Sequence, residues 1–206
     1  MALAPFPTQT RRHAAGWEIV ALTDEGAPYV LGQVSSSEES IQVSFDFGTT
    51  GLSTVNPVII LTVMEDTHGY AWSVPRIRSS WNTGFIAVLQ SSTNNLHEGR
   101  KTVGYLAIDS GTGHIAGRPY QAIRTPAELK EQWMRYQYLM PVQQPAVFGT
   151  VSMAGPHPCN LVMQQPGTRA VNIRVQEPVE CGADGVRRDN EKAYLLVLDH
   201  NGTTAQ

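Results

Sequence analysis

Residues 56–109 read NPVIILTVMEDTHGYAWSVPRIRSSWNTGFIAVLQSSTNNLHEGRKTVGYLAID, and this stretch decides the fold class of the 206-residue chain. It contains three runs rich in valine, isoleucine, leucine and aromatic residues: Val58–Met64, Phe85–Leu89 and Val103–Ile108. Proline, glycine, asparagine or aspartate bounds each run, as is typical of antiparallel strands joined by turns. No part of the stretch has the periodicity of an amphipathic helix. The sequence therefore predicts an all-β fold.

Further strands are predicted on the N-terminal side of this stretch. Trp17–Leu22 and Pro28–Val34 are extended apolar runs, separated by the turn signal Asp24-Glu25-Gly26. Residues 43–47 (VSFDF) alternate between apolar and polar side chains, which is the period of a strand with one buried and one solvent-exposed face. Residues 1–15 are interrupted by prolines, and we expect them to form an extended leader.

The second half of the chain repeats the first at a nearly constant offset. Residues 43–47 fall on residues 134–138 (MRYQY), 91 positions later. Because five strand-like blocks recur in the same order, we interpret the second half as a diverged copy of the first. The other four blocks have offsets of 91, 88, 86 and 89 positions: Pro28-Tyr29 recurs as Pro119-Tyr120, Asn56-Pro57-Val58 as Gln144-Pro145-Ala146, Leu89-Gln90 as Val175-Gln176, and Tyr105-Leu106 as Tyr194-Leu195.

One segment conflicts with this interpretation. Thr125-Pro126-Ala127-Glu128 is a good helix start, with a threonine cap, proline at the first helical position and glutamate at the third. The residues that follow, 133–138 (WMRYQY), alternate like a strand. Since the repeat also places a strand there, we expect residues 126–131 to form at most one or two helical turns.

Each copy, of about 80 to 90 residues, is too short for a doubly wound sheet and lacks the long helices of that fold. Two packed antiparallel sheets are the natural solution, so we expect two tandem small antiparallel β-sandwich domains. The glycine-rich segment SGTGHIAG (110–117) is the expected boundary between them. The predicted organisation is a leader (1–15), a first sandwich (16–110), a linker (111–118), a second sandwich (119–200) and a polar tail (201–206).

Two of the predicted strands, Val58–Met64 and Tyr194–Leu198, are apolar on both faces. A sandwich strand needs only one apolar face, so we expect the other face to pack against the sister domain or another subunit. The residues expected in the first core are Phe45, Ile59, Leu61, Phe85, Val88 and Tyr105. Those expected in the second core are Tyr136, Val147, Val151, Ile173 and Tyr194.

Composition limits the classes of partner. The net charge is −3 and only 16% of the residues are charged, so we expect no nucleic-acid partner. No run approaches the roughly 20 apolar residues of a membrane span, which predicts no membrane insertion. The order of charges in the N-terminal segment is the reverse of a signal peptide, so we expect a cytoplasmic protein or part of a released particle. Cys159 and Cys181 are expected to be reduced thiols, with a single disulfide as the alternative.

The sequence does not favour an enzyme. It has no GxSxG nucleophile elbow, HExxH zinc motif, P-loop or dinucleotide-binding glycine pattern. Asp109-Ser110-Gly111 with His114 has the residue types of nucleophilic catalysis, but a serine in a glycine-rich segment is usually a turn residue. His157 and Cys159 are two positions apart without a second pair at ligand spacing. We therefore expect no catalytic residue, no cofactor and no metal site.

One cluster between residues 70 and 82 has the chemistry of sugar binding. Aromatic rings stack on the apolar face of a sugar, and the planar groups of arginine and asparagine hydrogen-bond to its hydroxyls. The alternative is that the tryptophans pack in a core or an interface and that the arginines are solvated. The members of the cluster are Tyr70, Trp72, Arg76, Arg78, Trp81 and Asn82.

The order of the motifs carries a resemblance. VSF, a loop, NPVIILTV, RI, TGFIAVLQ, a loop with His and Glu, and VGYLAID follow one another along the first half. In this order the chain resembles the H-type lectin domain, the C-terminal domain of discoidins and of snail agglutinins. The resemblance covers Ile41–Asp109 well and Trp133–Asp199 more faintly. It implies a six-stranded antiparallel sandwich that trimerises and binds galactose or N-acetylgalactosamine at subunit borders.

The resemblance also implies site residues. The family's sugar contacts include an arginine in the strand before the GF element and polar or aromatic residues in the loop after it. This chain departs from the family because no tryptophan follows Phe85 in that loop. In the second copy Met163 and Gln164 stand near the arginine positions, which implies that this copy has lost the site. Together with the cluster, the expected ligand-binding residues are Trp72, Arg76, Arg78, Trp81, Asn82, Asn94, Asn95 and His97.

Two functions are compatible with these observations. The first is a non-catalytic carbohydrate-binding or adhesion protein that forms a homotrimer and binds glycans. The second is a structural component of a large assembly, such as a virion, tail or capsid-associated protein, in which the same domains serve as packing modules. The sequence does not separate the two.

Overall fold

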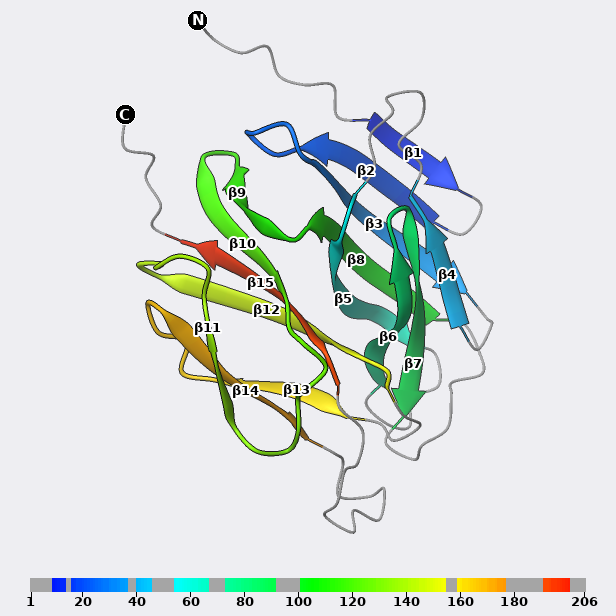
Figure 1. Ribbon diagram of the computed structural model, residues 1–206. Coiled ribbons are helices and arrows are strands. Elements are labelled where there is room, and N and C mark those ends of the chain that lie inside the picture. The colour runs from blue at the N-terminus through cyan, green and yellow to red at the C-terminus, as the bar shows by residue number, and fades with distance from the viewer. Residues whose placement is uncertain are drawn as a thin grey trace, which may run out of the picture.

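The computed structural model describes residues 9–13, 16–36, 40–45, 54–66, 73–91, 101–154, 159–176 and 191–200. These residues form fifteen strands and no helix (Figure 1), so the all-β fold class is confirmed. The strands are β1 (Gln9–His13), β2 (Gly16–Leu22), β3 (Pro28–Ser36), β4 (Ser40–Ser44), β5 (Pro57–Asp66), β6 (Ser73–Trp81), β7 (Gly84–Ser91), β8 (Lys101–Asp109), β9 (Gly111–Ile115), β10 (Arg118–Arg124), β11 (Met134–Gln137), β12 (Pro145–Ser152), β13 (Asn160–Gln164), β14 (Ala170–Gln176) and β15 (Ala193–Asp199).

The strands form three sheets. A five-stranded sheet has the order β1-β2-β3-β8-β5, a seven-stranded sheet has the order β4-β7-β6-β12-β15-β10-β9, and a three-stranded sheet has the order β11-β14-β13. Among the described strands all neighbours are antiparallel except β6 and β12. These two pair in parallel at Arg76–Val151 and Ile77–Ser152 only. The seven-stranded sheet is therefore three strands of the first half joined to four strands of the second by a short parallel contact.

The strand order agrees with the offsets found in the sequence. In the first half β2-β3-β8-β5 form part of one sheet and β4-β7-β6 part of another. In the second half β9-β10-β15-β12 and β11-β14-β13 are arranged in the same two orders. Pro57 pairs with Asp109, and the corresponding Pro145 pairs with Asp199. The same pattern of strand pairing is thus built twice from different side chains.

A pair of aspartates repeats with the strands. Oδ1 of Asp109 accepts hydrogen bonds from the backbone N–H groups of Val55 and Asn56 at 2.7 and 3.0 Å. The carboxylate of Asp199 accepts hydrogen bonds from the N–H groups of Gln143-Gln144 at 2.9 and 3.1 Å. In each half the last strand therefore ends on a carboxylate that fixes the loop before its neighbour, β5 or β12.

The glycine-rich segment predicted as a linker is part of the sheet. Residues 111–118 form β9, a turn and the first residue of β10, and β9 pairs with β10 along its whole length. Only Ser110 separates β9 from β8, and Gly111 takes a φ of 139° at this bend, which side chains disfavour. Residues 126–131 form no helix; Leu129 makes an isolated bridge with Glu191 instead.

Two hydrophobic cores share the seven-stranded sheet. Along β15, Tyr194 and Leu196 pack in the first core, whereas Ala193, Leu195 and Val197 pack in the second. This alternation explains why β15 is apolar on both faces, because each face covers a different core. In the first core the rings of Phe45, Phe85 and Tyr105 lie within 5.3 to 6.2 Å of one another.

Most of the predicted core residues are where the sequence places them. Phe45, Ile59, Leu61, Phe85 and Tyr105 lie in the first core, Val151 and Ile173 in the second, and Tyr136 and Val147 pack against the second while partly buried.

Two core predictions need correction. Tyr194 packs in the first core, because β15 turns its even-numbered side chains to that side. Val88 is buried but lies outside both cores, on the face of β7 where it pairs with Arg76. Cys159 is buried in the second core, and Cys181 lies outside the described residues.

Candidate functional site

Four of the eight predicted ligand-binding residues lie within the described part of the chain, and they have two different environments. Arg76 is buried, with none of its surface exposed. Arg78 and Asn82 are exposed and Trp81 is half-buried, all at the end of β6 and in the turn that follows it. The remaining four, Trp72, Asn94, Asn95 and His97, lie outside the described residues.

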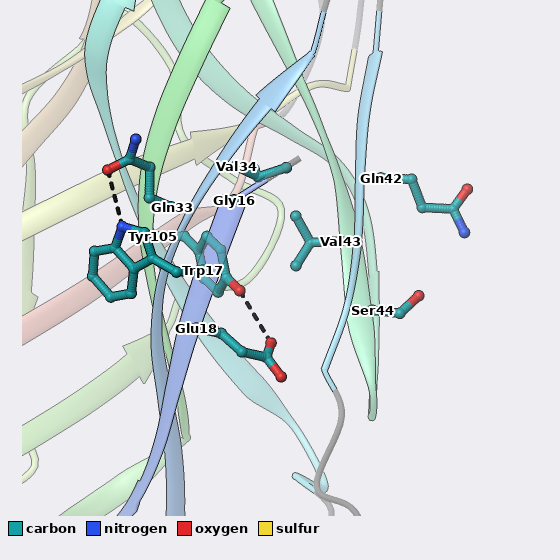
Figure 2. Close-up of a pocket in the computed structure, with 9 residues that line it drawn as sticks. All are labelled: Gly16, Trp17, Glu18, Gln33, Val34, Gln42, Val43, Ser44 and Tyr105. Atoms are coloured by element: carbon teal, nitrogen blue, oxygen red, sulfur yellow. Dashed lines mark hydrogen bonds between the residues drawn. The ribbon is translucent and has the colours of Figure 1, made fainter. Parts of the chain in front are cut away.

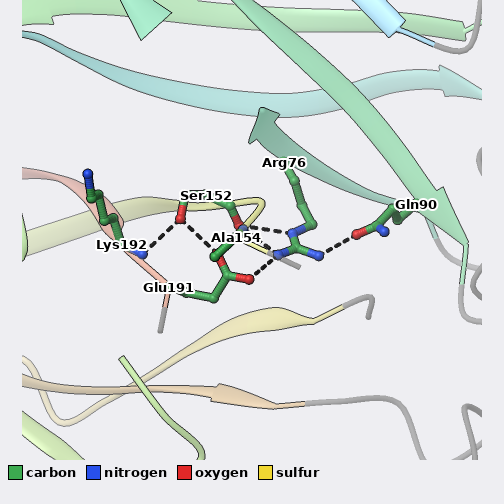
Figure 3. A network of polar contacts seen from close by, with 6 residues as sticks. All are labelled: Arg76, Gln90, Ser152, Ala154, Glu191 and Lys192. Carbon is green, nitrogen blue, oxygen red and sulfur yellow. Dashed lines mark hydrogen bonds and ion pairs between the residues drawn. The ribbon is translucent and has the colours of Figure 1, made fainter. Parts of the chain in front are cut away.

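Arg76 is the centre of a buried polar network (Figure 3). Its Nε and Nη2 donate to the carbonyl oxygen of Ser152 at 3.0 and 2.8 Å. Nη1 donates to Oε1 of Gln90, and Nη2 forms an ion pair with Oε1 of Glu191. Oε2 of Glu191 accepts hydrogen bonds from Oγ of Ser152 at 2.7 Å and from the N–H of Ala154 at 2.9 Å.

This network joins the two halves of the chain. Arg76 and Gln90 belong to β6 and β7, whereas Ser152 and Glu191 belong to the second half. A ligand would reach the guanidinium group only by displacing Ser152 or Glu191, so the structure gives Arg76 an internal role. The sequence did not indicate this role because Glu191 is 115 positions away and lies outside every repeated block.

The exposed members of the cluster form a small surface at the β6–β7 turn. The register of β6 against β7 shifts between Ile77 and Ser79, so Arg78 is the extra residue of a bulge. The ring of Trp81 lies over Gly84, where a Cβ atom would come within 2.6 Å of it. The carbonyl oxygen of Asn82 accepts a hydrogen bond from Oγ1 of Thr54. Arg78, Trp81 and Asn82 are therefore held close together on a short, anchored segment.

A cavity that the sequence did not indicate lies between β2 and β3 on one side and β4 on the other (Figure 2). Its volume is about 350 Å³. Tyr105 and Val43 point into the space between the strands, and Gln42 and Ser44 point away from it on the far side of β4 (Figure 2). The lining residues are Gly16, Trp17, Glu18, Gln33, Val34, Gln42, Val43, Ser44 and Tyr105.

The polar chemistry of the cavity comes from Glu18 and Tyr105. Glu18 is only 1% exposed, and its Oε2 accepts a hydrogen bond of 3.3 Å from the hydroxyl of Tyr105. Burial, and then the nearby charge of Glu18, raise the pKa of Tyr105 well above its usual value, so the phenol stays a donor at any physiological pH. On the outer face of β2, Nε1 of Trp17 donates to Oε1 of Gln33 at 3.2 Å. A signal for this site was available in the sequence, since Glu18 is a charged residue inside the apolar run WEIVAL.

A second cavity, of about 300 Å³, lies where the two halves meet. Leu61, Val74, Thr150 and Leu161 are among its lining residues. The N–H of Leu61, on the outer edge of β5, donates to Oγ1 of Thr150 at 2.8 Å. Because residues of both halves line it, we regard this cavity as part of the junction.

Other kinds of site find no support in the described part of the chain. Within those ranges no group of three histidine, cysteine, aspartate or glutamate side chains is placed to hold a metal ion. The same residues contain no helix long and apolar enough to cross a membrane.

Comparisons with protein-family models, with curated proteins and with solved structures found no match.

Proposed function

We propose that the protein is a non-catalytic carbohydrate-binding protein built from two copies of one antiparallel β-sandwich of the H-type-lectin kind. The two copies are supported by the identical strand orders and by the repeated aspartate contacts of Asp109 and Asp199. Glycan binding is supported by the cavity next to β4, where a carboxylate and a phenol lie beside the apolar side chains of Val34 and Val43.

The pair Glu18–Tyr105 is the observation that carries the glycan proposal. A carboxylate accepts hydrogen bonds from sugar hydroxyls, and a phenol both donates and accepts. Val34 and Val43 supply apolar surface for the C–H face of a sugar ring. The volume of the cavity lies at the lower end of the range of roughly 300–1,000 Å³ for small-ligand pockets, which suits a monosaccharide or disaccharide unit.

A glycan array followed by calorimetry tests this proposal. We expect a neutral monosaccharide or disaccharide to bind the wild-type protein and Tyr105→Phe to weaken it by a factor of about ten or more, since a hydrogen bond to a charged or buried partner is worth roughly 1.5–3 kcal/mol. Tyr138→Phe is the matched control, because the Tyr138 hydroxyl is buried without a hydrogen-bond partner among the described residues. Absence of any glycan binding at millimolar concentration would refute the proposal.

A further variant separates the two possible sugar sites. Arg78 is exposed at the β6–β7 turn, far from Tyr105 in the sequence and beside Trp81 and Asn82. If Arg78→Ala abolishes binding while Tyr105→Phe leaves it unchanged, the sugar site is at the turn that the sequence predicts. The opposite pattern assigns it to the cavity.

A second candidate function, assembly into a larger particle or a homotrimer, is favoured by a row of aliphatic residues on the five-stranded sheet. Ile19, Leu31, Leu106 and Ile60 are paired in register across four strands, on the face opposite to Val30. Leu31 is 40% exposed. Such a row is a liability for an isolated monomer and is typical of an interface. Light scattering should give three times the 22.5 kDa chain mass, and Leu31→Asp should return the protein to a monomer. A monodisperse 22.5 kDa species for the wild type would contradict autonomous trimerisation.

A further inference from the structure

The outer face of the three-stranded sheet is polar and aromatic. Along its strands every second side chain, such as Tyr136, Ile173 and Met163, packs in or against the second core. The side chains between them lie on the opposite face, since neighbours along a strand alternate. We call this surface the β14 face. Its members are Trp133, Arg135 and Gln137 on or next to β11, Asn172, Arg174 and Gln176 on β14, and Asn160, Val162 and Gln164 on β13.

The register sets these residues in rows across the strands. Arg135, Asn172 and Gln164 form one row. Arg174 and Val162 are paired in the next row, where Trp133 lies beside Arg174. Strands are about 4.8 Å apart and alternate residues about 6.8 Å apart, so the face is roughly 10 Å wide across its three strands. This width matches a sugar ring and its substituents.

Trp133 and Arg174 form the centre of the β14 face. The indole of Trp133 is 43% exposed, and the guanidinium carbon of Arg174 lies 4.7 Å from the ring centroid. Nη2 of Arg174 donates to Oε1 of Gln176 at 3.3 Å, and Nε is buried with no hydrogen-bond partner among the described residues. The stacked ring fixes the guanidinium group while few of its five N–H donors have a protein acceptor.

The charged residues of the β14 face are all positive. Its nine residues include two arginines and five amide side chains but no aspartate or glutamate. The adjacent Lys130 and Glu131 have opposite charges and do not alter this balance. The whole chain has a net charge of −3, so a positive face does not simply reflect overall composition. Fixed guanidinium groups among amides and an exposed indole suit a sugar that carries sulfate or carboxylate groups.

A second copy of the chain fits this face poorly. In the first half the corresponding face is covered at Arg76 by Ser152 and Glu191 of the second half. At the offset of 86 positions that relates β7 to β14, Val162 stands at the position of Arg76, so the β14 face lacks the guanidinium group at that position. The ion pair that joins the halves therefore cannot be repeated between chains here.

We propose that the β14 face binds an anionic glycan, with Trp133 stacked on a sugar ring and Arg174 and Arg135 bound to its sulfate or carboxylate groups. Asn172, Gln164 and Gln176 supply hydrogen bonds to neighbouring hydroxyls. This site is on the second half of the chain, and it is independent of the cavity lined by Glu18 and Tyr105.

Calorimetric titration of the full chain with a heparin tetrasaccharide, at about 0.15 M salt, tests the proposal. Trp133→Ala and Arg174→Gln should each weaken binding about tenfold or more, as expected for loss of a charge-assisted or stacking contact. Trp133→Phe should retain most of the affinity because it keeps a ring. The matched control is Arg118→Gln, which removes an exposed arginine at the β9–β10 turn. It should change affinity by less than about twofold, as for a rim charge in screening salt.

Two further ligands, a DNA oligonucleotide and a neutral tetrasaccharide, test whether the β14 face is specific for an anionic glycan. The proposal fails if the wild type does not bind the tetrasaccharide, if Arg118→Gln weakens binding as much as Arg174→Gln, or if a DNA oligonucleotide of equal charge binds equally well. A neutral tetrasaccharide should bind the face more weakly. Tyr105→Phe should leave heparin binding unchanged, so this test and the test of the cavity can fail separately.

Discussion

Strands β4-β7-β6, which are part of the seven-stranded sheet, and the three-stranded sheet β11-β14-β13 carry the same residue types on their outer faces but in different environments. Gln90 and Gln176 occupy corresponding positions, and each lies beside an arginine, Arg76 or Arg174. In the first sheet all three guanidinium nitrogens of Arg76 are bound and the side chain is fully buried. In the second sheet Arg174 has one described acceptor and lies under an exposed tryptophan.

The difference arises at the edge strand. β6 is paired with β12 of the second half, which brings Ser152 and Glu191 over Arg76. Among the described residues no strand pairs with the outer edge of β13. The outer edge strand is therefore a joint in the first half, at β6, and a free edge among the described residues in the second, at β13. At the joint, the carboxylate of Glu191 pairs with the buried guanidinium group of Arg76. On the surface, the guanidinium group of Arg174 has one acceptor among the described residues, Oε1 of Gln176.

The largest expected effect comes from breaking this joint. Glu191→Ala should destabilise the protein by roughly 3–5 kcal/mol, because it leaves the buried charge of Arg76 without its counterion. Arg174→Ala should cost less than about 1 kcal/mol, since the side chain is partly exposed and paired only with neutral groups. Urea denaturation of the two variants measures both values.

A double variant sharpens that comparison. Arg76→Met with Glu191→Leu removes both charges at similar volume, and such replacements are often neutral or stabilising by about 1–4 kcal/mol. A double variant as unstable as Glu191→Ala alone would show that the hydrogen bonds to Ser152 and Gln90 dominate the network. Equal losses for Glu191→Ala and Arg174→Ala would contradict the distinction between joint and surface.

Much of the fold follows from local patterns in the sequence. Alternation and turn residues locate strands such as β5, β7 and β8, and the constant offsets anticipate that β15 corresponds to β8. For β15, the two apolar faces of the strand also predict correctly that each face is covered by packing. These features depend on neighbours in sequence or on a repeat, and both are visible in one chain.

The errors have one physical cause, which is contact at long range. Arg76 has the residue type of a sugar ligand, and only the position of Glu191 makes it internal. Tyr194 belongs to a strand, β15, that is apolar on both faces, and only the packing of β15 decides which core the tyrosine enters. Residues 111–115 look like a linker because glycine is common there, yet pairing with β10 makes them a strand. No local pattern reports these partners.

An intermediate effect is expected at Asp109 and Asp199, whose equivalent contacts test whether the two halves gain similar stability from them. Asp109→Ala and Asp199→Ala each remove two hydrogen bonds from a carboxylate to backbone N–H groups, and each should cost about 1–3 kcal/mol in urea denaturation. Asp199 is only 6% exposed, so its loss should be the larger of the two. A substantial loss at one aspartate and none at the other would show that the two copies share geometry without sharing energetics. Asp→Asn variants, which keep one acceptor oxygen, are the controls.

The smallest expected effect concerns a second contact between the halves. This contact is exposed, whereas the Arg76–Glu191 contact is buried. Glu25, in the β2–β3 turn, accepts a hydrogen bond from the backbone N–H of His114 at 2.9 Å, and its Oε1 lies 2.6 Å from Nδ1 of His114. These contacts, the backbone one first, lower the pKa of Glu25 from 4.5 to about 2. Because the pKa is lower in the folded state, the contact stabilises the protein above pH 4.5, and this contribution is lost as the pH falls toward 2. The side chain of Glu25 is 48% exposed, so the gain in stability should stay below about 1 kcal/mol and diminish with added salt.

Carboxyl NMR titration should place the midpoint of Glu25 near 2, and His114→Ala should raise this midpoint only part of the way to 4.5, because the backbone N–H remains. A wild-type midpoint near 4.5 would show that the β2–β3 turn and β9 are not in contact in solution.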